Sequence, residues 1–392
     1  MAGRGQIVPE LDRLAGALAE QMAGRGDWPS RSPWIRAAME ALPRHLFAPD
    51  LLYHWDGRAY VPVDRRTDPD GWTRLVYADP DTAAVPQVTN GLPSSSLSCA
   101  AVVADMLDSL LLEPGQRVLE LGTGTGWNAA LLARRAGHGR VASVEVDEGL
   151  AGAARERVEA AGTPVDVRVA DGALGLPEGA PYDRVIATYA VPRVPWTWVE
   201  QCAPGGRIVF PWGPLGHVAL TVAPDGRSAS GRVQGLAQFM SARGAEDRAR
   251  DYAAVRGTGP ADGERPVHRD LTPLHEGYGL RFALRVAVPG LRLTTAVDED
   301  GVNAWLHDGH GSWASLTAEP DGTTTARRGG PRRLADEVEH AWDRWRALGS
   351  PGPREYGMTV HQDRQYVWCL DPATGPRWPV GDGAPAQPRP AH

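Results

Sequence analysis

The chain has 392 residues, 42% hydrophobic and 23% charged, which is long enough for two domains that each bury a core. Its formal net charge of −7 argues against sequence-independent binding to nucleic acid, and no apolar run approaches the roughly 20 residues of a membrane span. The N-terminus lacks the apolar core of an export signal, and three widely spaced cysteines form neither a disulfide framework nor a zinc spacing, so we expect a cytoplasmic protein without a metal site.

The first hundred residues combine predicted helices with one long irregular segment. Apolar residues recur at helical spacing over 11–22, and a second helix is expected over 34–42. Residues 53–93 are rich in Pro, Gly, Asp and Tyr, which predicts a long ordered loop rather than regular structure. A third helix is expected over 99–112.

Strands and helices alternate in the next part of the chain. Strands are expected at 117–121, 140–146, 165–170, 182–190 and 205–213, with helices at 127–137, 148–162 and 195–203 between them. This alternation predicts a parallel sheet covered on both faces. Two more strands within 217–243, joined by an Asp-Gly turn, predict an antiparallel pair.

The composition then changes. Residues 244–267 are polar and interrupted by Gly and Pro, as in a connector or a loose helix, and 278–320 have the pattern of short strands. Apolar residues at helical spacing over 334–345 predict another helix. We expect a separate α+β domain over 244–372, and a Pro/Gly-rich tail over 373–392 that is predicted to be disordered.

Three glycines on alternate positions follow the first strand of the alternating region. In "VLELGTGTGWN", Glu120 precedes Gly122, Gly124 and Gly126, one residue short of the dinucleotide spacing G-x-G-x-x-G. An acid at this strand end would repel a pyrophosphate and suits a ligand with a cationic or hydroxylated end. S-adenosylmethionine has a sulfonium, an ammonium group and no phosphate, so the motif favours this cofactor.

Acidic residues also end the next two predicted strands. Glu145 is placed to accept hydrogen bonds from ribose hydroxyls, and Asp171 with Gly172 is placed for the adenine amino group. The carboxyl ends of parallel strands share one edge of the sheet, where ligands bind in this architecture. The ordered set favours S-adenosylmethionine over the alternative of ordinary strand-ending turns.

Six stretches together resemble the protein-L-isoaspartate O-methyltransferase family. They are "MEALPRHLFAPDLL", "RVLELGTGTGWNAALLA", "SVEVDEGL", "VADGALG", "PYDRVIATYAVPRVP" and "APGGRIVFPWG", and the resemblance covers residues 8 to about 243. It implies a Rossmann-like class I S-adenosylmethionine-dependent methyltransferase fold, α/β in class, over 1–243, with N-terminal helices, the segment 53–93 and a core at 99–243. It implies S-adenosyl-L-methionine as cofactor and S-adenosyl-L-homocysteine as product. The implied cofactor-binding residues are Glu120, Gly122, Thr123, Gly124, Gly126, Glu145, Val146, Asp171 and Gly172.

A serine-rich stretch lies where the family has a Thr-Ile-Ser-x-Pro motif. In "SLSCA", Ser96 aligns with the threonine and Ser98 with the serine, but Ala100 replaces the proline. The resemblance implies that Ser98 touches the substrate carboxylate, and that Ser96 and Thr188 also belong to the catalytic group, Thr188 lying near the methyl. The alternative is that the serines only cap the helix that follows.

The predicted chemistry needs no general base. A carboxylate has an ordinary pKa near 4 and is already ionised at neutral pH, so alignment with the methyl group and exclusion of water remain as the tasks of the site. We therefore expect His45 to be structural and His217 to be solvated. Core packing is expected rather than peptide binding for most of Trp55, Trp72, Trp127 and Trp212.

The segment 53–93 and the extra domain depart from a housekeeping repair enzyme. Both resemble methyltransferases that accompany ATP-grasp ligases in the maturation of side-chain-crosslinked ribosomal peptides (graspetides). That resemblance implies a crosslinked peptide as partner, with the extra domain recognising it. An Asp side chain would be methylated, and the ester would close to an aspartimide (succinimide).

Several alternatives stay open at this stage. Arg65, Arg66 and Arg74 either meet an acidic peptide or form a solvated face. General L-isoaspartyl repair is the second candidate function, and a catalytically weak peptide-binding protein is the third, because Ala100 departs from the motif. The target Asp, the final product and the oligomeric state are not specified by these patterns.

Overall fold

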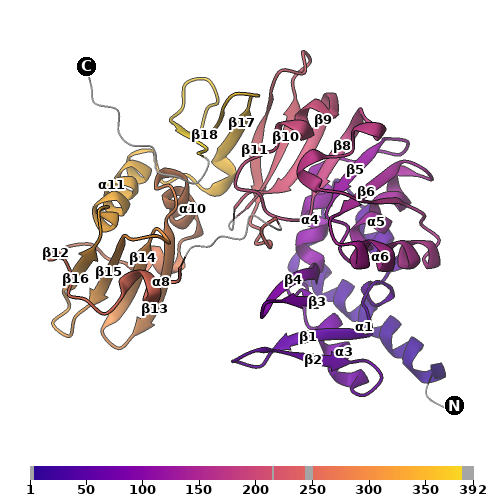
Figure 1. The fold of residues 1–392 in the computed structure, drawn as a ribbon, viewed down its shortest axis with the longest axis horizontal. Helices are drawn as coiled ribbons and strands as arrows, with labels where there is room; N and C mark the ends of the chain where they lie inside the picture. Colours follow the sequence, from indigo (N-terminus) through magenta and orange to yellow (C-terminus); the bar gives the residue numbers. More distant parts are fainter. Residues whose placement is uncertain (1–3, 214–215, 243–249, 382–392) are drawn as a thin grey trace. The chain divides into compact units, whose positions relative to one another are not determined.

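A computed structural model describes residues 4–213, 216–242 and 250–381. The chain divides into two units, each with its own internal packing (Figure 1). Unit 1 comprises Met1–Arg243 with Val360–Gln362, and unit 2 comprises Gly244–Thr359 with Asp363–His392. The domain boundary expected at 243–244 lies outside the described residues.

The centre of unit 1 is a twisted sheet in the strand order β11-β10-β9-β8-β5-β6-β7. Strands β5 to β9 are parallel, and β10 and β11 are antiparallel, which confirms the predicted Rossmann-like fold class. The strands are β5 (Val118–Leu121), β6 (Val141–Glu145), β7 (Asp166–Val169), β8 (Tyr182–Ala187), β9 (Cys202–Pro211), β10 (His217–Val222) and β11 (Ala229–Gly235).

Helices cover this sheet close to the predicted positions. α4 contacts β8, β9 and β10, α5 contacts β5 and β6, and α6 contacts β6 and β7, while α7 contacts β9 (Figure 1). α6 begins after Asp147, whose carboxylate caps the helix by accepting from Leu150 N at 2.9 Å. The helices are α4 (Ala100–Leu110), α5 (Trp127–Ala136), α6 (Glu148–Ala160) and α7 (Trp196–Glu200), with short turns η2 (Gly172–Leu174) and η3 (Pro177–Gly179).

The segment 53–93 is not the loop that we predicted. With its flanks it forms a four-stranded antiparallel sheet in the order β2-β1-β3-β4, and α3 packs on β1 and β2. Short strands broken by Pro and Gly have too few residues for a clear alternation, and Asp68 with Pro69 starts the helix. The elements are β1 (Leu51–Trp55), β2 (Tyr60–Asp64), α3 (Pro69–Val76), β3 (Ala84–Thr89) and β4 (Leu92–Leu97).

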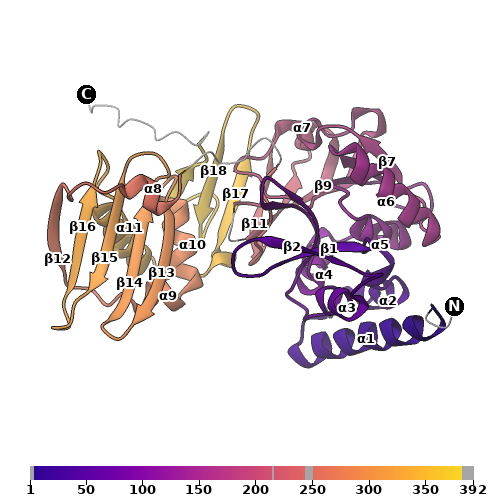
Figure 2. The ribbon, with the colours of Figure 1, turned by 60° about the horizontal axis from the view of Figure 1, so that its bottom comes forward.

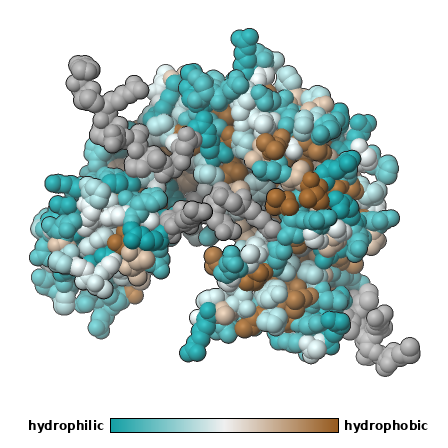
Figure 3. All heavy atoms as spheres, in the orientation of Figure 1, coloured by the Kyte–Doolittle hydropathy of each residue, from teal (hydrophilic) through white to brown (hydrophobic). Residues whose placement is uncertain are grey.

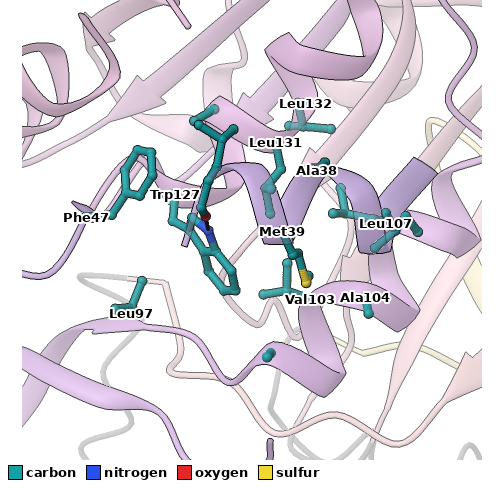
Figure 4. Close-up of a cluster of buried hydrophobic side chains, with 14 of the residues drawn as sticks. Ala38, Met39, Phe47, Leu97, Val103, Ala104, Leu107, Trp127, Leu131 and Leu132 are labelled. Atoms are coloured by element: carbon teal, nitrogen blue, oxygen red, sulfur yellow. Dashed lines mark hydrogen bonds between the residues drawn. The ribbon is translucent and has the colours of Figure 1, made fainter. Parts of the chain in front are cut away.

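The N-terminal helices α1 (Arg4–Arg25) and α2 (Trp34–Ala41), with the turn η1 (Arg44–Leu46), complete unit 1. Their apolar side chains join those of α4 and α5 in one buried cluster (Figure 4). Met39 and Phe47 contribute from the N-terminal side, Leu97 from the end of β4, and Trp127 from the start of α5. The cluster therefore ties the serine-rich strand to the helix that follows the glycine turn.

Unit 2 contains a five-stranded antiparallel sheet in the order β12-β16-β15-β14-β13. α11 packs against β14, β15 and β16, and α10 packs against α11 (Figure 2). The strands are β12 (Gly263–Val267), β13 (Arg292–Asp298), β14 (Gly301–His307), β15 (Trp313–Ala318) and β16 (Thr324–Gly329). The helices are α8 (Tyr252–Arg256), α9 (Thr272–Glu276), α10 (Tyr278–Ala287) and α11 (Leu334–Ala347), and η4 (Pro353–Glu355), β17 (Tyr356–Val360), β18 (Gln365–Cys369) and β19 (Arg377–Pro379) follow.

Two predictions for this part of the chain are wrong. Residues 278–287 form helix α10 rather than a strand, because their alternating apolar residues are buried on more than one side: Leu284 lies in the cluster with α11, while the Phe282 ring packs 5.1 Å from Tyr356. The tail expected to be disordered from residue 373 includes β19, which pairs with β18. The rest of that tail, 382–392, lies outside the described residues.

No helix in the described ranges has a stretch long and apolar enough to cross a membrane. On the face drawn in Figure 3, hydrophilic side chains predominate and hydrophobic ones gather in small groups between them.

Candidate functional site

The turn between β5 and α5 packs tightly against the end of β8. Gly122 has a φ of 95°, and a Cβ on it would lie 2.5 Å from Thr188 Oγ1 and 3.0 Å from Tyr189 Cδ1. Only glycine combines this backbone conformation with such a close approach. The Thr188 hydroxyl donates to the carbonyl of Gly122, and the Thr123 hydroxyl pairs with Ser143 at 2.6 Å. The turn is therefore held from both neighbouring strands.

The two other glycines of the turn have different surroundings. The Gly124 amide donates to Glu145 Oε2 at 2.9 Å, which links the turn to the end of β6. A Cβ on Gly126 would lie 3.2 Å from Val158 of α6, so this glycine allows α5 to begin close beside α6. The structure thus gives Gly126 a packing role, and its contact with a cofactor stays a prediction.

Glu120 does not face the edge of the sheet as the sequence suggested. Its side chain is completely buried and accepts from Asn128 Nδ2 at 2.8 Å and from the Ser143 hydroxyl. Burial raises the pKa of Glu120 to about 7, although both hydrogen bonds oppose the rise. Glu120 therefore supports the structure beside the turn through Asn128 and Ser143, and its contact with a cofactor stays a prediction.

Glu145 is the acid that borders the turn directly. It ends β6, is 6% exposed, and accepts from the amides of Gly124 at 2.9 Å and Asp147 at 3.1 Å. Each carboxylate oxygen has a second lone pair, so the group can also accept from ligand hydroxyls. The next residue, Val146, exposes 52% of its surface at the same edge.

Tyr189 spans the space between the glycine turn and the end of β7. Its ring lies against Gly122, and a Cβ on Gly172 would be 2.4 Å from its hydroxyl. Trp198 holds the other side of this group: its ring packs edge-on against Tyr189 at 6.3 Å, and its Nε1 donates to the Gly172 carbonyl at 2.8 Å. Asp171 is exposed beside them and accepts from Ala173 N.

The electrostatic character of this edge is negative. The pKa of the Tyr189 phenol is raised, first by burial and then by the nearby carboxylates of Asp171 and Glu145. Neither of these acids has an ion pair with an arginine in the part of the chain that the structure describes. Two carboxylates without an ion pair, beside a buried phenol, suit a cationic, hydroxylated ligand and not a phosphate. The donor set therefore fits S-adenosylmethionine.

The serine-rich strand β4 borders the same turn. The backbone oxygen of Ser96 would be 3.6 Å from a Cβ on Gly124, and Gln87 of β3 donates to Asp147 Oδ2 at 3.1 Å. The hairpin of β3 and β4 thus contacts the ends of β5 and β6. α4 begins after Cys99, which makes no side-chain cap, so the alternative that the serines cap this helix is wrong. The Ser98 hydroxyl, half-buried, has no hydrogen bond to any described residue.

A buried arginine fixes the backbone around Ser98. The Arg44 guanidinium is 2% exposed, lies 5.6 Å from the Trp127 ring centroid, and has no acidic partner among the residues that the structure describes. Burial lowers its pKa to about 10. It donates instead to four carbonyl oxygens, those of Val76, Thr82, Leu97 and Ser98. Arg44 therefore joins α3, the start of β3 and the end of β4 at one point.

The remaining candidates divide between the core and the surface. His45 is buried and pairs with the Tyr77 hydroxyl at 2.6 Å, in keeping with a structural role. The prediction that His217 is solvated is wrong, because this residue is completely buried in β10 beside Ser109. Trp72 and Trp127 are core residues, whereas Trp55 is 54% exposed and Trp212 is half-buried.

Two of the three arginines in the segment 53–93 have partners within it. Arg65 lies over the Trp72 ring at 4.5 Å, and Arg66 pairs with Asp64 at 2.9 Å. Arg74 is exposed. These contacts favour a local structural role for Arg65 and Arg66.

The structure thus brings together the glycine turn, Glu145, the pair Asp171–Gly172, the end of β8 and the serine strand. Sequence reasoning missed Tyr189, Ser143 and Arg44. Tyr189 could have been suspected, since it follows a strand that ends at this edge, but only the fold places its ring between two glycines. Ser143 and Arg44 carry no local signal, because their partners come from distant segments.

The chain is similar to several known proteins. Residues 29–234 match the family model for protein-L-isoaspartate(D-aspartate) O-methyltransferase. A protein-L-isoaspartate O-methyltransferase of Anaeromyxobacter dehalogenans is 46% identical over 145 residues, which is 36% of this chain and 68% of the relative. One from Aeropyrum pernix is 37% identical over 216 residues, 54% of this chain and 72% of the relative. A solved protein-L-isoaspartate O-methyltransferase aligns with 21% identity and a TM-score of 0.48, covering 91% of this chain and 99% of that one.

Proposed function

Since the chain belongs to the protein-L-isoaspartate O-methyltransferase family, it is an S-adenosylmethionine-dependent carboxyl O-methyltransferase, and we propose that its substrate is an Asp side chain of a crosslinked ribosomal peptide. The observation that carries the proposal is the second unit: the family match ends at residue 234, and unit 2 adds a folded sheet and helices of its own.

In this proposal, S-adenosylmethionine supplies a methyl group that is already activated by its sulfonium. Glu145 and Asp171 would accept from the hydroxyls and amino groups of the cofactor, and Val146 and Tyr189 would contact its apolar surface. The backbone of the glycine turn permits close approach, while Glu120 holds Asn128 and Ser143 beneath it. The Thr188 hydroxyl fixes the turn by donating to the Gly122 carbonyl, and the position of Thr188 near the methyl group stays a prediction.

The task of this chain's residues is alignment. The substrate carboxylate is ionised at neutral pH and needs no base. The free hydroxyl of Ser98 would donate to one carboxylate oxygen and so direct the other oxygen towards the methyl group that the cofactor would supply. Ser96 contributes backbone beside the turn. Correct orientation of the reacting atoms is worth roughly 7–11 kcal/mol, enough for substantial catalysis without acid–base chemistry.

The methyl ester then reacts within the peptide. The backbone amide nitrogen of the following residue attacks the ester carbon and loses its proton, and methanol leaves. The product is a five-membered succinimide (aspartimide). On an isoaspartyl residue the same steps lead back towards aspartate, whereas on a normal Asp they install the imide.

General L-isoaspartyl repair is the second candidate function. The names of the relatives favour it, since both are protein-L-isoaspartate O-methyltransferases. A peptide-binding protein without turnover is the weaker alternative: Ala100 replaces a motif proline, but it is buried at the start of a regular α4 and leaves Ser98 free. The free thiols of Cys99, Cys202 and Cys369 agree with the cytoplasmic location that we propose.

Three peptides distinguish these functions. The purified chain, with S-adenosylmethionine, is given an isoaspartyl peptide, a linear Asp peptide and the side-chain-crosslinked form of that Asp peptide, and methyl transfer is followed by mass spectrometry. We expect methylation and loss of methanol with the crosslinked peptide. Methylation of the isoaspartyl peptide alone would establish repair, and binding without any methylation would establish the third alternative.

A further inference from the structure

Unit 2 contains a pocket that the methyl-transfer site does not use. It has a volume of about 480 Å³ and lies between the segment after β12 and the last turns of α11. Its walls combine aromatic and basic side chains. The lining includes His268, Arg269, Trp342, Trp345, Arg346 and Ser350.

Arg269 has an unused donor in this pocket. Its guanidinium lies 4.7 Å from the Trp342 ring centroid, and Nη2 donates to Asp343 at 2.6 Å. Nη1 is buried and has no hydrogen-bond partner in the part of the chain that the structure describes. A buried N–H of a cation is costly to leave unpaired, so its position suits an acceptor supplied by a ligand.

The other charged groups around the pocket are Arg346 and two acids. Arg346 is exposed in the last turn of α11 and has no ion-pair partner among the described residues. Two acids belong to this neighbourhood: Asp343 pairs with Arg269 and lies within charge interaction of Arg346, and Asp270 lines the pocket and accepts from the amide of Thr272. Within the described part of the chain, the pocket therefore presents one guanidinium donor without a hydrogen-bond partner and one guanidinium without an ion pair, beside the exposed carboxylate of Asp270.

The aromatic walls are fixed in place. Trp342 is 4% exposed and belongs to the core of unit 2, and Trp345 Nε1 donates to the Pro351 carbonyl at 2.9 Å. Indole faces beside a cationic donor suit a short aliphatic stem that ends in an anion, because the stem gains apolar contact while the anion meets the guanidinium.

We propose that this pocket binds an Asp or Glu side chain of the peptide substrate: Arg269 Nη1 and Arg346 donate to its carboxylate, and the indoles of Trp342 and Trp345 contact its aliphatic stem. This inference rests on the proposed function, because it assigns unit 2 the acidic part of a crosslinked peptide. It would hold a carboxylate other than the methylated one, and so select peptides by their acidic residues.

The test uses the full chain and a probe without free termini, an acetylated and amidated tetraglutamate, with the matching tetraglutamine as control. Binding is measured by titration calorimetry at low salt without a methyl donor. We expect the glutamate peptide to bind at least ten-fold more tightly than the glutamine peptide. Inorganic phosphate is the competitor: if it displaces the probe at micromolar concentration, the pocket is a phosphate site and the proposal is overturned.

Substitutions of single arginines test whether the tetraglutamate peptide binds in this pocket. Arg346→Gln and Arg269→Gln should each weaken it about ten-fold, which is the loss of one charge-assisted hydrogen bond. Arg333→Gln removes the same charge at the opposite end of α11 and should leave the affinity unchanged. The Arg346 side chain has no hydrogen bond or ion pair among the described residues and only a charge interaction with Asp343, so Arg346→Gln tests the proposal even if Arg269→Gln unfolds unit 2. Equal affinity of Arg346→Gln and Arg333→Gln would overturn the proposal.

The two proposals fail in different experiments. If the pocket binds no carboxylate, methyl transfer to a crosslinked peptide is still measurable. If the proposed function is wrong, no crosslinked peptide is methylated, whatever the affinity for tetraglutamate.

Discussion

The hydroxyl of Tyr189 lies against the α-carbon of Gly172, so closely that a Cβ on the glycine would be 2.4 Å from it. The same tyrosine ring closes on Gly122 and is backed by Trp198. One aromatic side chain therefore connects the ends of β5, β7 and β8, at the edge of the sheet where we place the cofactor.

We expect Gly172→Ala to weaken S-adenosylhomocysteine binding about ten-fold. The new methyl group would collide with the Tyr189 hydroxyl, and the ring cannot retreat because it is packed between Gly122 and Trp198. Calorimetric titration measures the affinity. The double variant Gly172→Ala with Tyr189→Phe lacks the colliding oxygen and should recover part of the loss; no recovery would mean that the two residues do not act through this contact.

Ser98→Ala should lower kcat/KM for methyl transfer by about 10- to 100-fold, the effect of losing one hydrogen bond to a charged group. Its hydroxyl has no structural partner among the described residues, so the unfolding midpoint and the affinity for S-adenosylhomocysteine should stay as in the unmodified protein. Steady-state kinetics with the peptide substrate provide the measurement. Unchanged turnover would remove Ser98 from the site.

Arg44→Met should lower the free energy of unfolding by about 3 kcal/mol. The substitution leaves several buried carbonyl groups without a donor, each costing about 1–3 kcal/mol before relaxation. Urea unfolding provides the comparison. Arg36→Gln is the matched control, because Arg36 makes exposed ion pairs with Glu20 and Glu40 and a contact with the Trp28 ring at 5.8 Å, and its loss should cost about 1 kcal/mol. Equal effects would contradict the anchoring role of Arg44.

Glu120 gives stability a specific pH dependence. Folding raises its pKa from 4.5 to about 7, so its contribution is complete below pH 4.5 and declines as the pH rises towards 7. Relative to Glu120→Gln, which cannot ionise, the unmodified protein should lose on the order of 1.4 kcal/mol per pH unit in this window. Urea unfolding of both proteins from pH 4.5 to 8 measures the difference. A difference independent of pH would show that Glu120 is not perturbed by burial.

The core of unit 1 could be predicted because central strands such as β5 and β6 are apolar, buried runs that alternate with helices. The sheet formed by 51–97 could not be predicted from alternation, since its strands are half-buried and three of them contain a proline. One local signal was present: Asn90 and Gly91 both have positive φ, 52° and 79°, as an Asn-Gly hairpin turn between β3 and β4 requires. That pair of residues was sufficient to suspect a hairpin.

The candidate site shows a second limit of prediction from the sequence. The sequence places Glu145, Asp171 and Gly172 at strand ends, and the structure finds them at one edge. The sequence does not reveal that the Glu120 side chain is completely buried, because burial of a strand-end acid depends on partners such as Ser143 from another strand. Helix α10 escapes prediction for a related reason: alternate apolar residues fit a strand and also a helix that packs on more than one side.

The most direct test is a crystal structure of the protein with S-adenosylhomocysteine. We predict the ligand at the carboxyl edge of the sheet, with its ribose hydroxyls on Glu145, its adenine beside Asp171 and Gly172, and its sulfur towards Ser98. Density for the ligand away from the glycine turn, or an edge that stays empty at saturating concentration, would contradict the assignment of this site.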